Sequence, residues 1–322
     1  MNQGNNFALV PKPPSAVENV APGAKRILSD MIADTLALRK NTPLSAKKFR
    51  IGDDAWCEPD YRQILIWARA LALAPAEITL RLQNGSKDTG FNAWGETRFC
   101  NGRLEKINWD FALLPMVHFE WVEELETTHL SFENTWQSPN RQPINIALPN
   151  LTHLHCRKAV NLINTPRLKY LNCSSFECYL DVELDLSKVP HLERLECGSA
   201  GWPFHNLSSL NLSAVPQLTH LSCGRNKISF LDLRNKSNLK VLNCGANNLS
   251  HLDLSGVPNL IILRCWENKI ENLDLNLVPH LEELVCQDNP MNILDITPLH
   301  KLRILKYNAD KVRLVQRPDQ HF

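Results

Sequence analysis

Apolar residues recur along the second half of the chain with a period of 21 residues. Cys223, Cys244, Cys265 and Cys286 lie 21 residues apart, each at the end of a Leu-x-x-Leu-x-Cys segment. The second leucine and the cysteine alternate with other residues, which is typical of a β-strand that buries one face. An evenly spaced series of this kind predicts one short strand per repeat and a stack of repeats that share a core.

The same register continues on both sides of this block. A further segment begins at Leu302 and carries Tyr307 in place of the cysteine, and upstream segments end at Cys197, Cys173 and Cys156 with unequal spacing. A proline two residues before the first leucine recurs at Pro149, Pro166, Pro190, Pro216, Pro258 and Pro279. These segments together predict about eight repeats.

The consensus LxxLxCxxNxLxxLDLxxxPx, read from Leu151 to Leu314, resembles the leucine-rich repeat (LRR). The resemblance implies an α/β protein whose repeats form a curved parallel β-solenoid, with cysteine where many members carry a third leucine. An asparagine follows each regular strand, and its side-chain amide can bond backbone groups that a bend leaves unpaired. The resemblance implies that these asparagines form a ladder. The predicted structural ladder comprises Cys156, Cys173, Cys197, Cys223, Cys244, Cys265, Cys286, Asn226, Asn247, Asn268 and Asn289.

The first half of the chain has a different pattern. Periodic apolar residues predict a helix over 24–40, Glu58-Pro59-Asp60 predicts the start of a second helix over 59–74, and a third is expected over 76–84. Asn101-Gly102 predicts the turn of a β-hairpin over 97–109. Leu130 and Phe132 fit the inward positions of a degenerate first repeat strand.

These patterns divide the chain into four parts. We expect a disordered arm over 1–22, an α+β capping domain over 23–134, the solenoid over 135–314 and a tail over 315–322. A cap is expected because an end repeat otherwise exposes its core. The order of helices, hairpin and cysteine-type repeats resembles bacterial LRR proteins whose function is unassigned.

Composition narrows the function classes. Lys and Arg number 35 and Asp and Glu number 34, a balance that argues against nucleic-acid binding. The apolar run Ile64–Pro75 is interrupted by Arg69, so no membrane span is expected. The cysteines form a repeat register and no signal peptide is evident, which favours reduced thiols in the cytoplasm. We also expect a monomer.

Catalytic motifs are absent from the sequence. The chain contains no GxxxxGK[ST], GxGxxG, HExxH, GxSxG or paired CxxC. We therefore expect no enzyme activity and no cofactor, and we expect a protein-interaction module that binds a protein partner.

The expected binding surface is the concave face, the exposed side of the strand ladder. The end formed by the first repeats is basic and histidine-rich, and the end formed by the last repeats is acidic. Aromatic and arginine side chains lie between them, and these residue types are typical of interface anchors. The predicted binding residues are Tyr170, Arg194, His220, Arg225, Ile262, Arg264, Trp266, Glu267, Glu283 and Asp288.

Besides a purely structural or self-associating role, which the insertions at 174–183 and 198–209 or a partly exposed Cys178 could mediate, two alternatives stay open at this stage. His153 and His155 share a strand face and His129 falls beside His153 if 127–132 is the preceding strand, so three imidazoles could hold zinc in a metal-binding protein or metal-dependent enzyme. The second alternative is a secreted bacterial effector that acts by binding host protein. The Asn, Ser and Pro of residues 1–22 are compatible with an unfolded secretion signal.

Overall fold

The computed structural model describes residues 49–84, 97–100, 103–110, 114, 125–133, 144–156, 160–174, 184–198 and 207–322. The predicted arm 1–22, the predicted helix 24–40 and the predicted hairpin turn at Asn101-Gly102 lie outside these residues.

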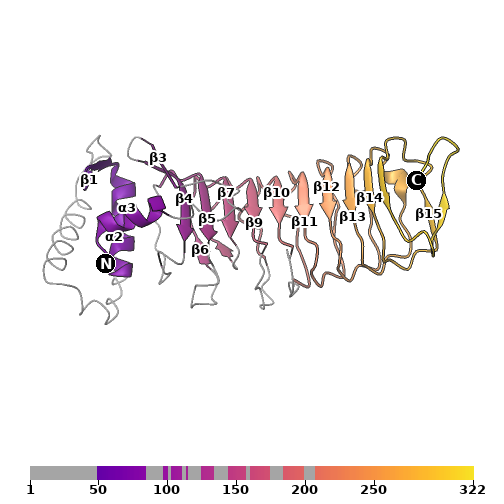
Figure 1. Ribbon diagram of the computed structural model, residues 1–322, viewed down its shortest axis with the longest axis horizontal. Helices are drawn as coiled ribbons and strands as arrows, with labels where there is room; N and C mark the ends of the chain where they lie inside the picture. Colours follow the sequence, from indigo (N-terminus) through magenta and orange to yellow (C-terminus); the bar gives the residue numbers. More distant parts are fainter. Residues whose placement is uncertain are drawn as a thin grey trace, which may run out of the picture.

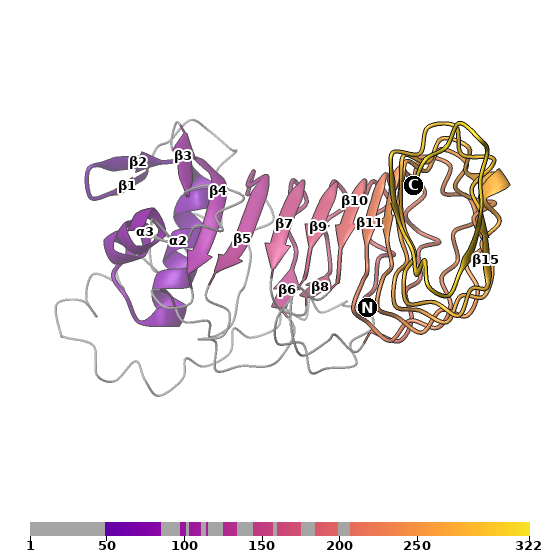
Figure 2. The ribbon, with the colours of Figure 1, turned by 45° about the vertical axis from the view of Figure 1, so that its right-hand side comes forward.

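Within the described residues, eleven strands form one sheet along the length of the molecule (Figures 1 and 2). All neighbours from β4 to β16 pair in parallel, and β3 joins β4 antiparallel at one end. The strands are β3 (Arg98–Cys100), β4 (Arg103–Asp110), β5 (His129–Glu133), β7 (His153–Cys156), β9 (Tyr170–Asn172), β10 (Arg194–Glu196), β11 (His220–Ser222), β12 (Val241–Asn243), β13 (Ile262–Arg264), β14 (Glu283–Val285) and β16 (Ile304–Lys306). The predicted LRR parallel solenoid is confirmed.

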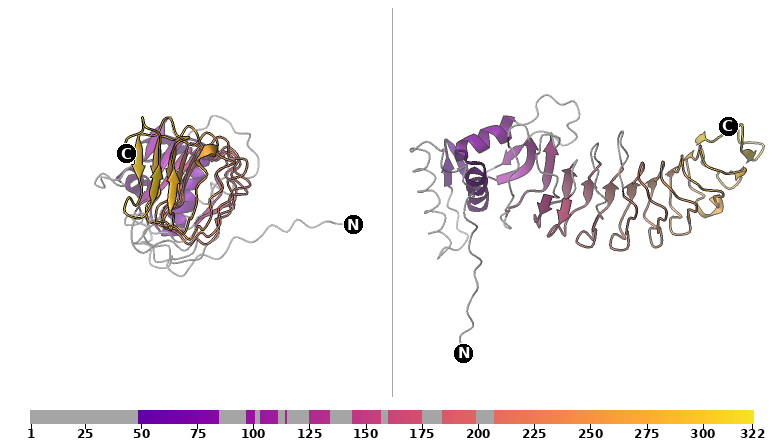
Figure 3. Two further views of the ribbon diagram at one scale, coloured as in Figure 1. Left: turned by 90° about the vertical axis from the view of Figure 1, so that its right-hand side faces the viewer. Right: turned by 90° about the horizontal axis from the view of Figure 1, so that it is seen from below.

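The other side of each coil returns the chain to the next strand. Short parallel pairs form there, β6 (Ile144–Ile146) with β8 (Val160–Leu162) and β15 (Ile293–Asp295) with β17 (Arg313–Val315). Among the described connections, one contains the 3-10 turn η3 (Leu275–Leu277). Proline in the connection fixes φ before the chain enters the next strand. Figure 3 shows that the row of coils bends along its length.

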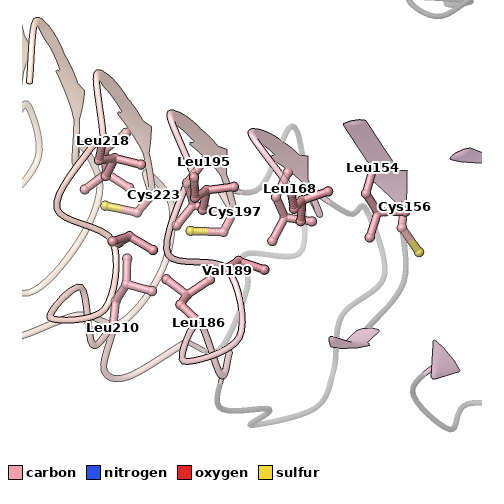
Figure 4. Close-up of a cluster of buried hydrophobic side chains, with 14 of the residues drawn as sticks. Leu154, Cys156, Leu168, Leu186, Val189, Leu195, Cys197, Leu210, Leu218 and Cys223 are labelled. Carbon is pink, nitrogen blue, oxygen red and sulfur yellow. The ribbon is translucent and has the colours of Figure 1, made fainter. Parts of the chain in front are cut away.

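The core is a stack of leucines and cysteines. Because side chains alternate along a strand, the middle residue of each strand and the cysteine after it turn inward. Figure 4 shows this arrangement for Leu195 and Cys197, with Leu186 and Val189 on the returning side of the coil. Leu242, Leu263, Cys244 and Cys265 have no exposed surface.

The asparagines after the strands bond to two coils at once. The Nδ2 atom of Asn247 donates to the Cys223 and Cys244 carbonyls, both at 3.0 Å, and its Oδ1 atom accepts the Ile228 amide at 3.0 Å. Asn268 repeats the pattern with Cys244 at 3.0 Å, Cys265 at 3.1 Å and Leu249 at 3.0 Å. The side-chain amide therefore satisfies backbone groups that the bend leaves without a strand partner. Asn226 and Asn289 make the corresponding bonds.

In the described part of the N-terminal end lie a hairpin and two helices, β1 (Phe49–Ile51), β2 (Asp54–Trp56), α2 (Glu58–Leu71) and α3 (Pro75–Asn84). Helix α2 begins with proline in its first turn beside Glu58 and Asp60, which favour a helix N-terminus. It ends three residues before the predicted residue 74, because Ala72 takes a left-handed φ of 53° and its amide bonds back to the last turn.

Strand β4 belongs to the main sheet. The sequence placed 97–109 in the capping domain, but β4 pairs in parallel with β5 from Lys106 opposite His129 to Asp110 opposite Glu133. The repeat register is not recognisable there because Ile107 and Trp109 fill the inward positions instead of leucine and cysteine. The solenoid sheet therefore begins inside the region predicted as the cap.

The C-terminal residues fold against the last coil. Gln320 exposes 7% of its surface and donates from Nε2 to the Ile296 carbonyl at 3.0 Å and to the Leu299 carbonyl at 2.9 Å. The residues predicted as a tail thus satisfy carbonyl groups of the preceding connection.

Within the described residues no single helix is long and apolar enough to cross a bilayer. Helices α2 and α3 reach that length and composition only when taken together, across a bend of 100°.

Candidate functional site

Two rows of outward side chains run along the concave face. The first row consists of the first residue of each strand of the main sheet from β5 to β16, and the second row consists of the residue two positions later in the same strand. The first row is His129, His153, Tyr170, Arg194, His220, Val241, Ile262, Glu283 and Ile304. The second row is Ser131, His155, Asn172, Glu196, Ser222, Asn243, Arg264, Val285 and Lys306.

The predicted binding residues fall in three places. Tyr170, Arg194, His220, Ile262 and Glu283 lie in the first row, and Arg264 lies in the second row. The remaining four follow the strands at the rim of the sheet: Arg225, Trp266, Glu267 and Asp288.

Ring systems stack along the N-terminal part of the first row. The His129 and His153 rings lie 4.2 Å apart between centroids at an interplanar angle of 6°, and the Tyr170 ring follows at 5.9 Å from His153. The Arg194 guanidinium lies 5.5 Å from the Tyr170 centroid, within cation–π range. These contacts hold successive side chains of the row in place.

Each of three histidines in this row follows a threonine. The Thr152 hydroxyl donates to the Thr128 carbonyl at 2.9 Å and lies 2.9 Å from Nδ1 of His153. A hydroxyl has one hydrogen, so Nδ1 carries a proton and donates to Thr152. Thr128–His129 and Thr219–His220 repeat the arrangement. The recurring Thr-His pair was visible in the sequence but its meaning depends on the coil register.

These histidines are held in the neutral form. Burial and the neighbouring His153 and Lys106 lower the pKa of His129 to about 4. Burial also lowers the pKa of His153, with Lys106 and Lys169 acting in the same direction against Glu193. The pKa of His220 is lowered by burial and by Arg194 and Lys240, against Glu196.

The three-histidine zinc hypothesis is wrong for the described residues. His129 does lie beside His153 as expected, but their rings stack face to face, so their nitrogen lone pairs run parallel rather than toward one point. His155 pairs with Ser131 in the second row. No group of three His, Cys, Asp or Glu side chains in the described part of the chain could hold a metal ion.

Charged side chains in both rows bond to one another. Arg194 contacts Glu196 at 2.6 Å, and the other Glu196 oxygen accepts Asn172 at 2.7 Å. At the other end of the sheet, Arg264 Nε lies 2.6 Å from Glu283 Oε1. The sequence assigned Arg264 and Glu283 separately, whereas the structure makes them partners across neighbouring strands.

Trp266 lies against the backbone of the preceding coil. A Cβ atom on Gly245 would lie 2.3 Å from Nε1 of Trp266, so the indole occupies the space that a side chain at 245 would fill. The Arg225 guanidinium, one coil further back, lies 5.7 Å from the Trp266 centroid. Residues 225, 245 and 266 thus form one cluster across three coils.

The repeat position directly after Gly245 and Trp266 has a left-handed backbone in four successive coils. The φ angles are 58° at Arg225, 52° at Ala246, 53° at Glu267 and 58° at Asp288. Non-glycine residues in this region cost about 1–2 kcal/mol each. The chain keeps three charged side chains at these strained rim positions.

Six of the seven ladder thiols are buried, and Cys173 is half-buried. Burial raises the pKa of Cys223 and of Cys286 to about 12, and raises that of Cys244 and Cys265 strongly. The eight cysteines whose side chains are described are free thiols. Cys178, singled out as a possible exposed thiol by its place in an insertion, lies outside the described residues.

A cavity of about 430 Å³ at the opposite rim was not anticipated. Its polar lining includes Lys240, Asn259, His280, Glu282 and Lys301 from successive coils. These residues precede the strands and are scattered in the sequence, so only the coil register brings them together.

Comparisons with known proteins return folds only. No family model and no curated protein matches the chain. Among solved structures, the functional domain of InlJ from Listeria monocytogenes, which includes a cysteine ladder, is 24% identical over 66% of this chain and 53% of its own, with a TM-score of 0.42. The internalin InlF from the same species is 19% identical over 59% of this chain and 57% of its own, with a TM-score of 0.44.

A third similar structure is the LRR protein LIC12759 of Leptospira interrogans. It is 14% identical over 74% of this chain and 86% of its own, with a TM-score of 0.40. This chain spans a little over half the length of the two Listeria proteins that it matches.

Proposed function

We propose that this chain is a protein-interaction module whose concave face binds a protein partner. The observation that carries the proposal is the packing of the exposed face: Arg264 with Glu283, Arg225 with Trp266, and Arg194 with Tyr170. Side chains that are fixed before binding lose little conformational entropy in a complex. Arginine and aromatic residues are also the types enriched at interface hot spots.

The test is affinity capture from native lysate with a charge-reversed face. In the variant Arg264→Glu plus Trp266→Ala, a carboxylate faces Glu283 and the aromatic anchor is lost. The matched control is Lys227→Glu plus Phe230→Ala, which changes the same kinds of residue at exposed positions beyond the strands.

A partner retained by the wild type and the control, and lost by the Arg264/Trp266 variant, supports the concave face. Equal capture by all three proteins would contradict it. Circular dichroism of each variant shows whether it is folded, so that a loss of binding can be distinguished from unfolding.

A further inference from the structure

Lys236 occupies an aliphatic core position of the repeat. The corresponding residue in other coils is Val189, Val215, Val257, Val278 or Leu299, each at most 1% exposed. Lys236 exposes only 2% of its surface, and Ser237 follows it where four of these five coils have proline. Figure 4 shows Val189 at this place, among the inward side chains of its coil. One charged residue therefore interrupts a column of aliphatic side chains.

The Lys236 amine has more N–H donors than hydrogen bonds. It carries three N–H groups when protonated, and among the described residues its one hydrogen bond is to the Arg234 carbonyl at 3.4 Å. Burial lowers the pKa of Lys236, and the nearby Asp232 opposes that shift. A buried ammonium is costly unless an acceptor or an anion compensates it.

A cavity of about 440 Å³ lies at this residue. It is lined by Ser213 and Pro216 of the preceding coil and by Asp232, Arg234, Asn235 and Lys236. The backbone of this coil also differs locally, since Asn235 takes a left-handed φ of 59°.

The charges that line the cavity favour a monoanion. Arg234 and Asp232 neutralise each other, with Nη2 at 2.6 Å from Oδ2 and Nε at 2.9 Å from Oδ1. This pairing lowers the pKa of Asp232 to about 2. Lys236 then supplies the unbalanced positive charge, and the fixed Asp232 carboxylate disfavours a dianion such as phosphate.

We propose that this cavity binds a carboxylate, with the Lys236 ammonium and the Ser213 hydroxyl as donors. The carboxylate belongs either to a small organic acid or to a polypeptide side chain or terminus. This site lies apart from the concave face and stands independently of the function proposed for that face.

The test follows the Lys236 Cε–Hε resonance of the full chain by NMR. The resonance is assigned by its absence in Lys236→Met, a variant that restores an apolar side chain to the core position and is expected to fold. The probes are sodium acetate, sodium phosphate, sodium chloride at equal ionic strength, and the peptide acetyl-Gly-Gly-Glu-amide. Lys227→Met, at an exposed position in the same coil, is the matched control.

A saturable shift with acetate, absent with chloride and at least tenfold weaker with phosphate, supports a site for a free acid. A saturable shift with the peptide alone supports a polypeptide source. Binding must be retained within twofold in Lys227→Met. The proposal fails if neither carboxylate shifts the resonance, if chloride or phosphate shifts it equally, or if Lys236→Met still binds acetate as measured by calorimetry.

Discussion

At the scale of single residues, this protein reuses a few polar side chains to hold its backbone. Each ladder asparagine satisfies carbonyl groups of two coils through Nδ2 and one amide through Oδ1. The buried ladder cysteines fill space in the core without requiring hydrogen-bond partners, because burial keeps their thiols protonated. Burial lowers the pKa of the first-row histidines His129, His153 and His220, and a threonine hydroxyl lies beside Nδ1 of each ring.

The first prediction concerns Asn247. Replacing it with alanine leaves the buried Ile228 amide without its partner and removes one of the two asparagine bonds to each of the Cys223 and Cys244 carbonyls, which keep those from Asn226 and Asn268. We expect Asn247→Ala to lower the free energy of unfolding by about 2–3 kcal/mol. Urea denaturation measures the loss, with the exposed neighbour Asn248→Ala as control. Equal stability of the two variants would show that the ladder bonds contribute nothing net.

The second prediction concerns pH. The pKa of His129 is about 4 in the folded chain, below the ordinary 6.5, so the folded state binds fewer protons than the unfolded state between these values. Stability is therefore complete above pH 6.5 and is lost as pH falls toward 4. We expect His129→Gln to reduce the loss between pH 7 and pH 4.5 in urea denaturation. The exposed His251→Gln is the control, and an unchanged pH dependence in His129→Gln would contradict the prediction.

At the scale of the element, close approach between coils decides which residues are tolerated. Gly198 and Gly224 leave room for the backbone of the next coil. A Cβ atom on Gly198 would lie 2.7 Å from the Gly224 carbonyl oxygen, and one on Gly224 would lie 3.0 Å from the Gly245 carbonyl oxygen. Gly245 instead makes room for the Trp266 indole. The left-handed residues Arg225 and Ala246 come directly after Gly224 and Gly245, so glycine serves packing here while other residues take the strained φ.

The third prediction tests this packing. In Gly245→Ala the new methyl group lies within 2.3 Å of Trp266 Nε1, so the indole must move. We expect a destabilisation of about 1–3 kcal/mol and a change in tryptophan fluorescence. In a Trp266→Ala background the same substitution should cost less than about 0.5 kcal/mol. A double-mutant cycle measures the difference, and equal costs in both backgrounds would place the strain elsewhere.

At the scale of the whole molecule, one buried carboxylate joins the helices to the sheet. Asp60 of α2 has no exposed surface, accepts the Leu104 amide of β4 at 2.7 Å and lies 3.0 Å from Arg103 Nε. Trp67 of α2 and Trp109 of β4 also meet, with ring centroids 5.0 Å apart. The N-terminal elements and the first coil therefore share one core, which explains why β4 cannot be separated from the solenoid.

The fourth prediction tests that joint. Asp60→Ala leaves the Leu104 amide and the Arg103 guanidinium without their buried acceptor. We expect a loss of about 3–5 kcal/mol in the unfolding free energy reported by Trp67 and Trp109 fluorescence. The transition followed by circular dichroism of the distant coils should move less, because each coil contacts only its neighbours. The exposed Asp54→Ala is the control, and coincident shifts by both probes would contradict the localised joint.

The sequence by itself determined the repeat, the strands and the inward positions, because a 21-residue period with alternation inside each strand permits one stacking register. It also placed His129 beside His153, since neighbouring strands of a solenoid align in that register. Only the tertiary structure showed that these rings stack instead of converging on a metal, that Arg264 bonds to Glu283, and that Trp266 fills the space beside Gly245.

The tertiary structure also decided the boundary of the solenoid and the place of Lys236. Strand β4 carries Ile107 and Trp109 inward, a pattern that one sequence cannot distinguish from a separate hairpin. Lys236 looks like an ordinary surface lysine until the coils align it with Val215 and Val257 in the core. Such facts depend on contacts between coils, and contacts depend on side-chain direction and distance, which a linear pattern of residue types does not contain.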